Sequence, residues 1–173
     1  MNHYHLFDTS MGLCGIAWSD DGVTHFQLPH SEDKARQRLA KHAEPGEPPP
    51  HIASAIEQAR DYFTGARPNF SAVPLDLAGI DAFRRQIYDV LRTVGWGETL
   101  TYGDMAKRIG ADGGAQAVGQ AMGQNPIPLI IPCHRVVAAG GKIGGFSAPG
   151  GSDTKERMLA LEGVYPNNQP RLF

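Results

Sequence analysis

Apolar and polar positions alternate loosely over residues 3–28, a pattern that is typical of β-strands. Turn signals at Gly12 and at Asp20-Asp21-Gly22 divide this stretch into three parts. The N-terminal region therefore predicts a small antiparallel sheet, built as a three-strand meander.

The pattern becomes helical after Ser31. Residues 32–43 are charged and amphiphilic, with acidic residues first and basic residues later, which is the order that a helix dipole favours. A breaker-rich loop follows over residues 44–50. Residues 51–64 then carry apolar side chains on one helical face before Gly65. We expect a surface helix over the first stretch and a second helix over the last.

Residues 66–79 contain two prolines and little periodicity, so they predict an extended connection between two domains. We place the boundary near residue 78. This gives an N-terminal α/β domain over residues 1–78 and a second domain over residues 79–173.

The second domain begins with a strong helical stripe. A helix from Ile80 places apolar residues on one face, namely Phe83, Ile87, Val90, Leu91 and Val94. Two short helices follow, from Thr101 to Ile109 and from Gly114 to Met122, with a glycine-containing turn between them. Helix, tight turn and helix form the outline of a helix-turn-helix.

The rest of the chain predicts a buried extended segment and one more helix. Residues 129–137 are mostly apolar and follow two prolines. Asp153 and Glu156 have the spacing of a capping box, and Gly163 would close the helix that they open. We expect a flexible tail from residue 164. The fold class is therefore α/β, with a mostly helical C-terminal domain that includes a short extended segment.

Composition places the chain among soluble globular proteins. Its 173 residues are 41% hydrophobic and 20% charged, which excludes disordered and fibrous classes. No apolar run approaches the roughly 20 residues that cross a bilayer, and the N-terminus lacks a basic segment followed by an apolar one. Two cysteines are too few for a disulfide framework. We expect a cytoplasmic protein without a membrane partner.

The charge is uneven along the chain. The net charge of -2 argues against a general nucleic-acid coat protein. Residues 1–78 hold 6 Lys and Arg against 10 Asp and Glu, a net charge of -4, whereas residues 79–173 hold 10 against 8, a net charge of +2. A polyanion should therefore prefer the C-terminal half.

The second short helix, GAQAVGQAMG, has one face that is nearly bare backbone, formed by Ala115, Gly119 and Met122. Interior glycines weaken a helix by roughly 1 kcal/mol each, a loss usually offset by a need for close approach. One interpretation is a helix pressed against a narrow surface such as the DNA minor groove. The alternative is close helix packing inside the core.

The two cysteines have different surroundings. Cys14 lies in an apolar strand and is expected to be an inert core residue. Cys133 is followed at once by His134 and Arg135, and a positive group nearby lowers the pKa of a thiol. The sequence has no CxxC motif and no histidine spacing typical of metal ligands, so we expect no metal. A cysteine hydrolase is an alternative, but the usual sequence contexts of its nucleophile are absent.

An extended strand would point Cys133 and His134 to opposite faces. They can then couple only if the chain bends, which Pro132 favours, or if a water carries the proton. A histidine base also needs an acidic partner to orient it, and Glu162 is one of few carboxylates after the motif.

The run NPIPLIIPCHRVVAAGGKIGGFS closely resembles the active-site signature of the O6-alkylguanine-DNA alkyltransferases, also called methylated-DNA–protein-cysteine methyltransferases. GETLTYGDMA, AQAVGQAMGQNP and the LEG at 161–163 extend the resemblance over nearly the whole C-terminal half. The resemblance implies an RNase H-like N-terminal domain and a C-terminal domain that binds DNA and accepts the alkyl group.

The resemblance also implies a role for individual residues. Cys133 would accept the alkyl group, His134 would act as a base through a water, Glu162 would hold the histidine, and Asn125 would be the structural asparagine of the hinge. The base pocket would comprise Tyr102, Met122, Val136, Phe146 and Ser147, and Tyr102 would also rotate a phosphate. Residues expected to contact DNA are Ala115, Gln116, Gly119, Arg85 and Arg135.

Two positions depart from the family pattern. Gln116 stands where relatives usually have an arginine that fills the gap left by the flipped nucleotide, so a positive charge toward DNA is missing. Phe146 stands where many relatives have tyrosine, which removes a hydroxyl.

The implied function is direct reversal of DNA damage. A monomer without a cofactor would bind double-stranded DNA, flip an O6-alkylguanine from the minor-groove side and take its alkyl group once, irreversibly. O4-alkylthymine is a further candidate substrate. Two alternatives stay open, a non-catalytic module that binds alkylated bases, and a protein that takes alkyl groups from free bases or other small molecules.

Overall fold

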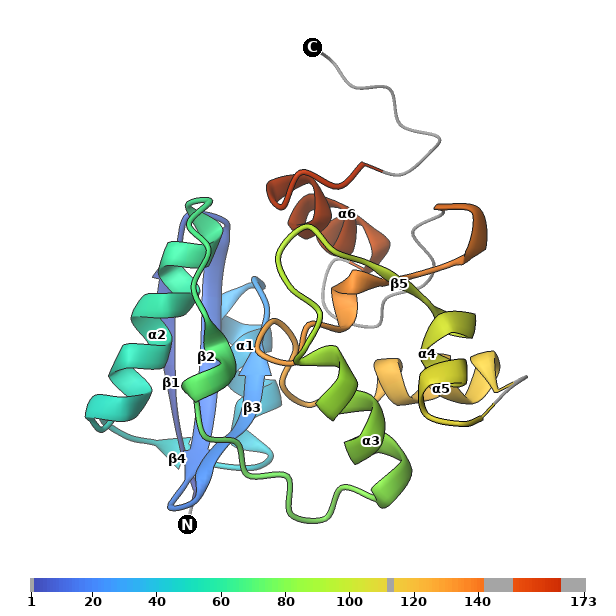
Figure 1. Cartoon of the computed structure of the whole chain (residues 1–173). Helices are drawn as coiled ribbons and strands as arrows, with labels where there is room; N and C mark the ends of the chain where they lie inside the picture. The colour runs from blue at the N-terminus through green and yellow to red at the C-terminus, as the bar shows by residue number, and fades with distance from the viewer. Residues whose placement is uncertain (1, 112–113, 142–150, 166–173) are drawn as a thin grey trace. The chain divides into compact units, whose positions relative to one another are not determined.

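The computed structural model describes residues 2–111, 114–141 and 151–165 (Figure 1). Its chain forms two compact units. The first comprises Met1–Gly79 together with Pro126–Ile130, and the second comprises Ile80–Asn125 together with Ile131–Phe173. The chain thus returns to the first unit for five residues just before the Cys133 segment, which the sequence did not indicate.

The first unit contains the predicted meander. Its strands form a sheet of order β3-β2-β1-β4, with bounds β1 (His3–Thr9), β2 (Gly12–Ser19), β3 (Gly22–Gln27) and β4 (Glu44–Pro45). β1 and β3 both pair antiparallel with β2. The antiparallel three-strand prediction is therefore confirmed.

Strand β4 was not predicted. It lies in the segment expected to be a loop and pairs parallel with the start of β1, at His3 and Tyr4. Pro45 can occupy this position because an edge strand needs no outward N–H group. The turn-forming composition of residues 44–50 does not predict a strand, because β4 is stabilised only by its pairing with β1.

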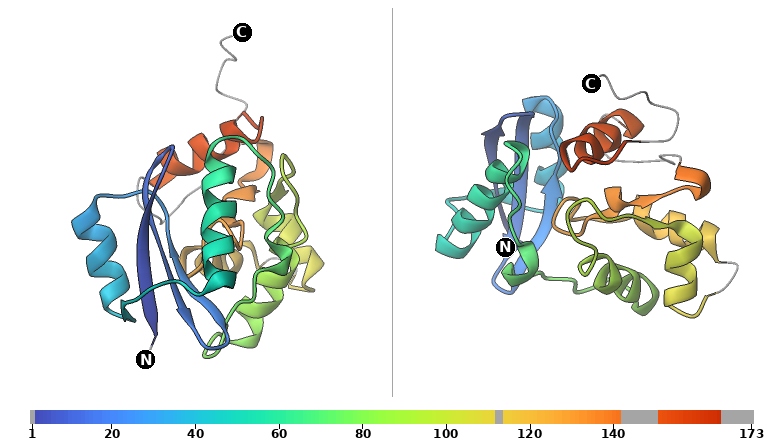
Figure 2. Two further views of the ribbon diagram at one scale, coloured as in Figure 1. Left: turned by 90° about the vertical axis from the view of Figure 1, so that its left-hand side faces the viewer. Right: turned by 45° about the horizontal axis from the view of Figure 1, so that its top comes forward.

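Helices α1 (Glu32–Ala40) and α2 (Pro50–Phe63) lie on opposite faces of this sheet. Leu39 of α1 packs with Tyr4, and the guanidinium of Arg60 in α2 lies 5.6 Å from the ring of Phe7. Odd and even positions of a strand point to opposite faces, so the two helices sandwich β1. Figure 2 shows both helices beside β1 (left panel).

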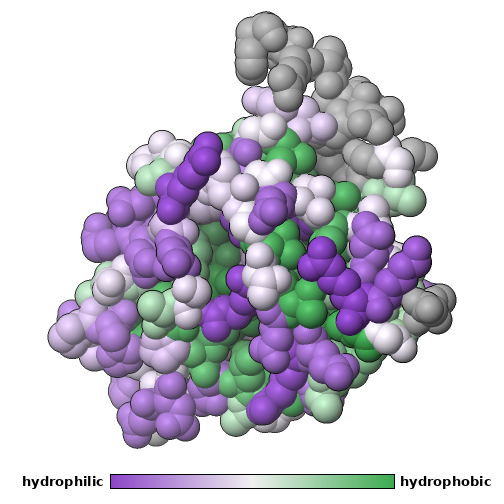
Figure 3. All heavy atoms as spheres, viewed as in Figure 1, coloured by the Kyte–Doolittle hydropathy of each residue, from purple (hydrophilic) through white to green (hydrophobic). Residues whose placement is uncertain are grey.

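The ends of these helices follow ordinary capping rules. The Ser31 side chain accepts a hydrogen bond from the backbone N–H of Lys34, while α2 begins at a proline. Helix α1 ends at Ala40, three residues before the predicted end. The outer side of α2 is hydrophilic, as the left of Figure 3 shows. Among the described residues, no helix is both long and apolar enough to cross a membrane.

The second unit is mostly helical, as predicted. Its elements are α3 (Ala82–Leu91), β5 (Leu100–Thr101), α4 (Tyr102–Arg108), α5 (Ala115–Gly123), the 3-10 turn η2 (Cys133–Arg135), β6 (Val136–Val137), the 3-10 turn η3 (Ala139–Gly141) and α6 (Gly151–Leu161). A further 3-10 turn, η1 (Phe70–Ala72), lies in the first unit. Strands β5 and β6 pair in parallel, which the sequence did not predict.

Helices α4 and α5 form the predicted helix-turn-helix outline. Thr101 caps α4, and its side chain and that of Asp104 satisfy each other's backbone N–H groups. The buried side of this pair holds Met105, Val118 and Ala121. Packing on this side leaves the opposite side of α5 exposed.

The predicted start of the last helix is wrong. Helix α6 begins at Gly151, two residues before Asp153, so Asp153 lies within the first turn instead of capping it. An acidic residue within the first turn still interacts favourably with the helix dipole. Gly163 adopts a positive φ of 81° just beyond the helix, as expected of a closing glycine. The tail, predicted to be flexible, lies outside the described residues from residue 166 onward.

Candidate functional site

Cys133 lies in a 3-10 turn, not in the extended segment that the sequence predicted. The backbone N–H of Arg135 donates to the carbonyl of Pro132 at 3.0 Å, which closes the turn. Cys133 is 5% exposed and His134 is fully buried. In an extended strand the side chains of Cys133 and His134 would point to opposite faces. In this turn, which bends at Pro132, both side chains are buried in the protein interior.

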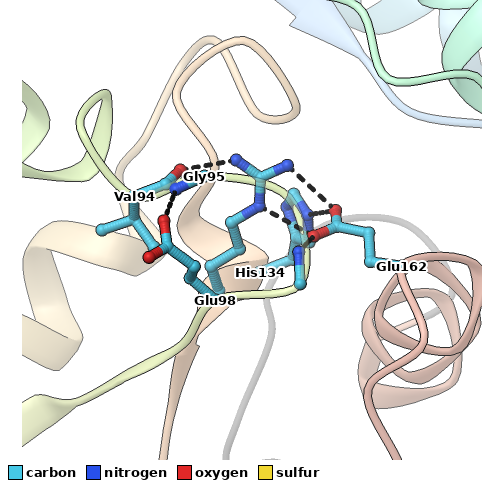
Figure 4. A network of polar contacts seen from close by, with 7 residues as sticks. Val94, Gly95, Glu98, His134 and Glu162 are labelled. Carbon is cyan, nitrogen blue, oxygen red and sulfur yellow. Dashed lines mark hydrogen bonds and ion pairs between the residues drawn. The ribbon is translucent and has the colours of Figure 1, made fainter.

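Glu162 holds the ring of His134. His134 Nε2 lies 2.6 Å from Glu162 Oε2, and both side chains are buried (Figure 4). The carboxylate follows the last turn of α6, where the backbone N–H of Glu162 donates to the carbonyl of Met158 at 3.2 Å. The backbone N–H of Gly97 donates to Glu162 Oε1 at 3.1 Å. The carboxylate is therefore fixed from several directions.

Arg135 completes this network. Its Nε and second terminal nitrogen donate to the two oxygens of Glu162 at 2.9 and 3.2 Å, and its other terminal nitrogen donates to the Val94 carbonyl at 2.7 Å. Only 13% of the Arg135 side chain is exposed. We expected this residue at the DNA surface, but its geometry is that of a group that neutralises and positions Glu162.

The electrostatics of the pair favour a neutral histidine. Burial lowers the pKa of His134, and the hydrogen bond that His134 donates to Glu162 only partly opposes this effect. Burial would raise the pKa of Glu162, but the hydrogen bonds and charges of His134 and Arg135 outweigh it and hold the pKa at about 2. An ionised Glu162 accepts a hydrogen bond from the Nε2–H group of His134. The proton of the neutral ring therefore stays on Nε2, and the lone pair resides on Nδ1.

Cys133 is a thiol at neutral pH. Burial raises its pKa to about 11, although a hydrogen bond from Asn125 and the charge of Lys155 act in the opposite direction. At pH 7 only about one thiol in 10⁴ would be ionised. The sequence argument that His134 and Arg135 lower this pKa therefore fails, because desolvation dominates. Attack by sulfur requires that a base remove the proton.

Lys155 is a site residue that the sequence analysis missed. It is fully buried, its Nζ donates to the Tyr102 hydroxyl at 3.4 Å, and the same nitrogen lies 5.6 Å from the Tyr102 ring centroid. Burial lowers its pKa to about 8, while the thiolate of Cys133 would raise it. The sequence held one signal: Lys155 and Glu162 are seven residues apart and share a helical face with Met158.

Asn125 links the end of α5 to the Cys133 segment. Its side-chain nitrogen donates to the Ile131 carbonyl at 2.9 Å, and its backbone N–H donates to the Met122 carbonyl at 3.2 Å. The amide also interacts with the Cys133 thiol. Its position is what a structural asparagine of the hinge requires.

The expected base pocket is only partly within the described residues. Tyr102 begins α4, Met122 lies near the end of α5 with 9% exposure, and Val136 is buried in β6 beside Leu100. Burial also raises the pKa of Tyr102. Phe146 and Ser147 lie outside the described residues.

Helix α5 exposes only part of the face that we expected to approach DNA, because Met122, the third residue of that face, is buried. Ala115 and Gln116 are exposed and Gly119 is partly exposed. A Cβ atom on Gly119 would meet a single neighbour, the Tyr102 ring, at 4.0 Å. Core packing therefore does not require glycine at position 119, which disfavours the alternative interpretation. Arg85 is exposed on α3, where its Nε donates to the Ile80 carbonyl at 3.0 Å.

No group of three or more metal-ligating side chains occurs within residues 2–111, 114–141 and 151–165. Both cysteines are unbridged, and burial raises the pKa of Cys14 to about 12. Cys14 is therefore far less acidic than an ordinary thiol, as expected of a core residue.

Comparison with known proteins decides the family. Residues 82–164 match the family described as "6-O-methylguanine DNA methyltransferase, DNA binding domain". A methylated-DNA–protein-cysteine methyltransferase of Mycolicibacterium paratuberculosis is 39% identical over 94% of this chain and 93% of its own length. The chain belongs to the methylated-DNA–protein-cysteine methyltransferase family. It is thus a DNA-repair methyltransferase with a DNA-binding domain, as the resemblance of the C-terminal half implied.

Other members of the methyltransferase family agree in sequence and fold. The relative from Methanothermobacter thermautotrophicus is 35% identical over 90% of this chain and 82% of its own length. A crystal structure of Mycobacterium tuberculosis OGT in complex with DNA superposes with a TM-score of 0.77 at 35% identity, covering 95% of this chain and 96% of that one. The fold class predicted from the sequence is confirmed.

Proposed function

We propose that this protein repairs O6-alkylguanine in double-stranded DNA by transferring the alkyl group, methyl in the simplest case, to Cys133. The observation that carries this proposal is the buried His134–Glu162 pair, joined at 2.6 Å, with His134 in the same 3-10 turn as the Cys133 thiol. A buried thiol with a raised pKa needs such a base. The family membership supplies the substrate class.

Access to the lesion requires nucleotide flipping, because the O6 atom of guanine lies inside the duplex. We assign the approach to the exposed face of α5, where Ala115 and Gly119 leave room for a closely packed groove. Gln116 would fill the gap in the base stack without adding charge. Tyr102, Met122 and Val136 would line the pocket together with Phe146 and Ser147, as the family resemblance implies.

Alkyl transfer begins with deprotonation of Cys133. The thiol proton passes through a water to His134 Nδ1, whose lone pair the Glu162 carboxylate directs. The sulfur then bonds to the alkyl carbon while the bond from that carbon to guanine O6 breaks, leaving the electron pair on guanine. The Tyr102 hydroxyl, which accepts a hydrogen bond from Lys155, is the proton donor to the base.

The product on Cys133 is a thioether. It has no acyl carbon that water can attack, so each molecule should act once. We also propose that the protein acts as a monomer in the cytoplasm, a reducing compartment in which Cys133 stays a thiol. O4-alkylthymine is a further proposed substrate.

The experiment that tests this function counts turnovers. A tenfold excess of duplex carrying a labelled O6-methylguanine is incubated with the protein, and label on protein and intact lesion in DNA are followed to a plateau. We expect one methyl group per protein molecule and an equal loss of lesion. Continued loss beyond one equivalent, or lesion binding without transfer, would contradict the proposal, and the latter would favour a binding module.

The free base O6-methylguanine serves as the comparison substrate. If duplex DNA reacts no faster than the free base, the alternative of a small-molecule acceptor, which Gln116 and the net charge of -2 suggested, replaces repair of DNA.

A further inference from the structure

The sheet of the first unit has a partly open edge on β1. Strand β1 runs from His3 to Thr9, but β4 pairs with it only at His3 and Tyr4. Among the described residues, no strand lies beside the remainder of β1. Figure 2 shows this edge between α1 and α2, with β1 in dark blue (left panel).

The backbone polarity of the open edge follows from its neighbours. The Tyr4 carbonyl accepts from Gly46 N–H at 3.1 Å on the β4 side. Because N–H and C=O groups of alternate strand residues point to the same side, Leu6 and Asp8 direct their groups to this edge as well. Arg60 Nε donates to the Asp8 carbonyl at 3.0 Å, so the remaining edge groups are those of Leu6 and the Asp8 N–H.

A cavity of about 510 Å³ lies along this edge. Its walls come from β1, from Leu13 of β2, from α1 and from residues 45–47 at the end of β4 and after it, and every residue that lines it belongs to the first unit. Tyr4 and Phe7 are buried at its floor, whereas Asp8 and Glu47 are exposed at its rim. The cavity therefore combines apolar contact area with unpaired strand edge.

The charge of the cavity is acidic. Three carboxylates line it, those of Asp8, Glu32 and Glu47, against the single guanidinium of Arg36. Arg36 already donates to Glu32 at 3.0 Å, and among the described residues no ion pair involves Asp8 or Glu47. A second copy of this edge would bring the same negative charges face to face, which is unfavourable.

We propose that the open edge of β1 binds an extended peptide segment of a partner protein that carries lysine or arginine at alternate positions. The segment adds a strand beside Leu6 through backbone hydrogen bonds, and its basic side chains reach Asp8 and Glu47. This recognition is separate from Cys133 and from the α5 face, so it would recruit the repair protein without occupying its site.

The test uses a fluorescein-labelled peptide of sequence Lys-Val-Lys-Val-Lys with the full-length protein. We expect saturable binding by fluorescence anisotropy, and none for Glu-Val-Glu-Val-Glu. The analogue with N-methylated valines keeps every charge but loses backbone donors, so it should bind at least tenfold more weakly. Peptide binding should also slow hydrogen exchange at the Leu6 amide. Binding through ion pairs alone would leave this exchange rate unchanged.

Matched charge variants locate the site. D8N/E47Q should weaken peptide binding by about fourfold to twenty-five-fold, at roughly twofold to fivefold for each exposed ion pair. D20N/D21N removes the same charge in the turn between β2 and β3 and should leave binding unchanged. Both variants should transfer methyl groups normally.

Three results would overturn the proposal. Equal binding of the N-methylated peptide would show charge attraction without strand addition. Equal weakening by both double variants would place the peptide elsewhere. Dimerisation of the free protein with protection of the Leu6 amide would assign the edge to a second copy.

Discussion

Glu162 is the residue on which the proposed chemistry depends most. Its carboxylate accepts from His134, from Arg135 and from the Gly97 backbone. The negative charge therefore serves two purposes, since it selects the tautomer of the histidine and neutralises a largely buried guanidinium. A neutral amide at this position would keep the shape and lose the charge.

We predict that E162Q slows methyl transfer by roughly 10²-fold, because His134 becomes a poorer proton acceptor. Single-turnover rates with an O6-methylguanine duplex measure this. E98Q is the matched control: Glu98 is exposed in the loop between α3 and β5 and accepts from Gly95 N–H at 2.6 Å without touching His134. Equal rates for the wild type and E162Q would show that the histidine–glutamate pair does not take part in methyl transfer.

Lys155 provides the second prediction at this scale. Its charge lowers the pKa of Cys133, and its own pKa of about 8 means that this charge disappears as the pH rises through 8. K155M, which keeps the length of the side chain, should slow transfer at pH 7 by about tenfold, the effect of one pKa unit on the thiol. It should also abolish any change in rate near pH 8.

K107M serves as the control for K155M, because Lys107 is exposed on α4. If K155M and K107M have the same rate and pH profile, Lys155 has only a structural role.

Helix α5 gives a prediction at the scale of an element. The Gly119 position is helical and nearly empty, so G119A should stabilise the fold by about 0.5–1 kcal/mol. The new methyl group would, however, separate the helix from the DNA surface. We expect weaker binding to duplex DNA with an unchanged salt dependence, since no charge is altered. A destabilised G119A protein that binds DNA normally would restore the core-packing interpretation.

The elements that the sequence predicted correctly are those with a strong local signal. The meander had turn residues at Gly12 and Gly22, and α4 had a capping residue at Thr101. The elements that were missed are short and depend on partners distant in sequence. Strand β4 exists because β1 lies beside it, and β5 exists because β6 does.

The turn at Cys133 illustrates the same limit within the site. The apolar residues before it predicted an extended chain, whereas the resemblance paired His134 with Glu162, whose side chains lie 2.6 Å apart. Their contact nevertheless depends on how α6 packs, which no local pattern encodes. Lys155 was missed because a lysine is rarely fully buried.

The whole molecule should lose stability in mild acid. Burial and the charge of His42 lower the pKa of His25 to about 4, and burial lowers that of His134. Below pH 6.5 these two histidines therefore bind protons in the unfolded chain but stay neutral in the folded chain. The contribution of these neutral histidines to the free energy of unfolding is complete above pH 6.5 and declines as the pH falls toward 4.

We predict that the unfolding temperature falls by about 5 °C between pH 7 and pH 4.5, as calorimetry would measure. H25Q should reduce this decline, whereas H51Q on the exposed start of α2 should not. A flat profile, or the same decline in both variants, would contradict this assignment. Below pH 4.5, Glu162 binds a proton in the unfolded chain but stays ionised in the folded chain, where its pKa is about 2, and this adds a further loss as the pH falls toward 2.

The charge distribution of the chain agrees with its proposed partner. The acidic N-terminal half carries the cavity proposed for a basic peptide, while the C-terminal half, with a net charge of +2, carries the proposed DNA-binding helix. This asymmetry can be read from the sequence, because counting charges needs no structure. The open edge of β1 required the structure, because strand pairing determines which edges remain.

The measurement that tests the central claim most directly is mass spectrometry of the intact protein and its peptides after incubation with a duplex containing one O6-methylguanine. We predict a single added CH2 group, located on the peptide that contains Cys133. It should be absent in C133A and with unmodified duplex, and fully retained in C14A, the variant of the other buried cysteine. An unmodified wild-type protein, or an adduct that survives in C133A, would contradict the account.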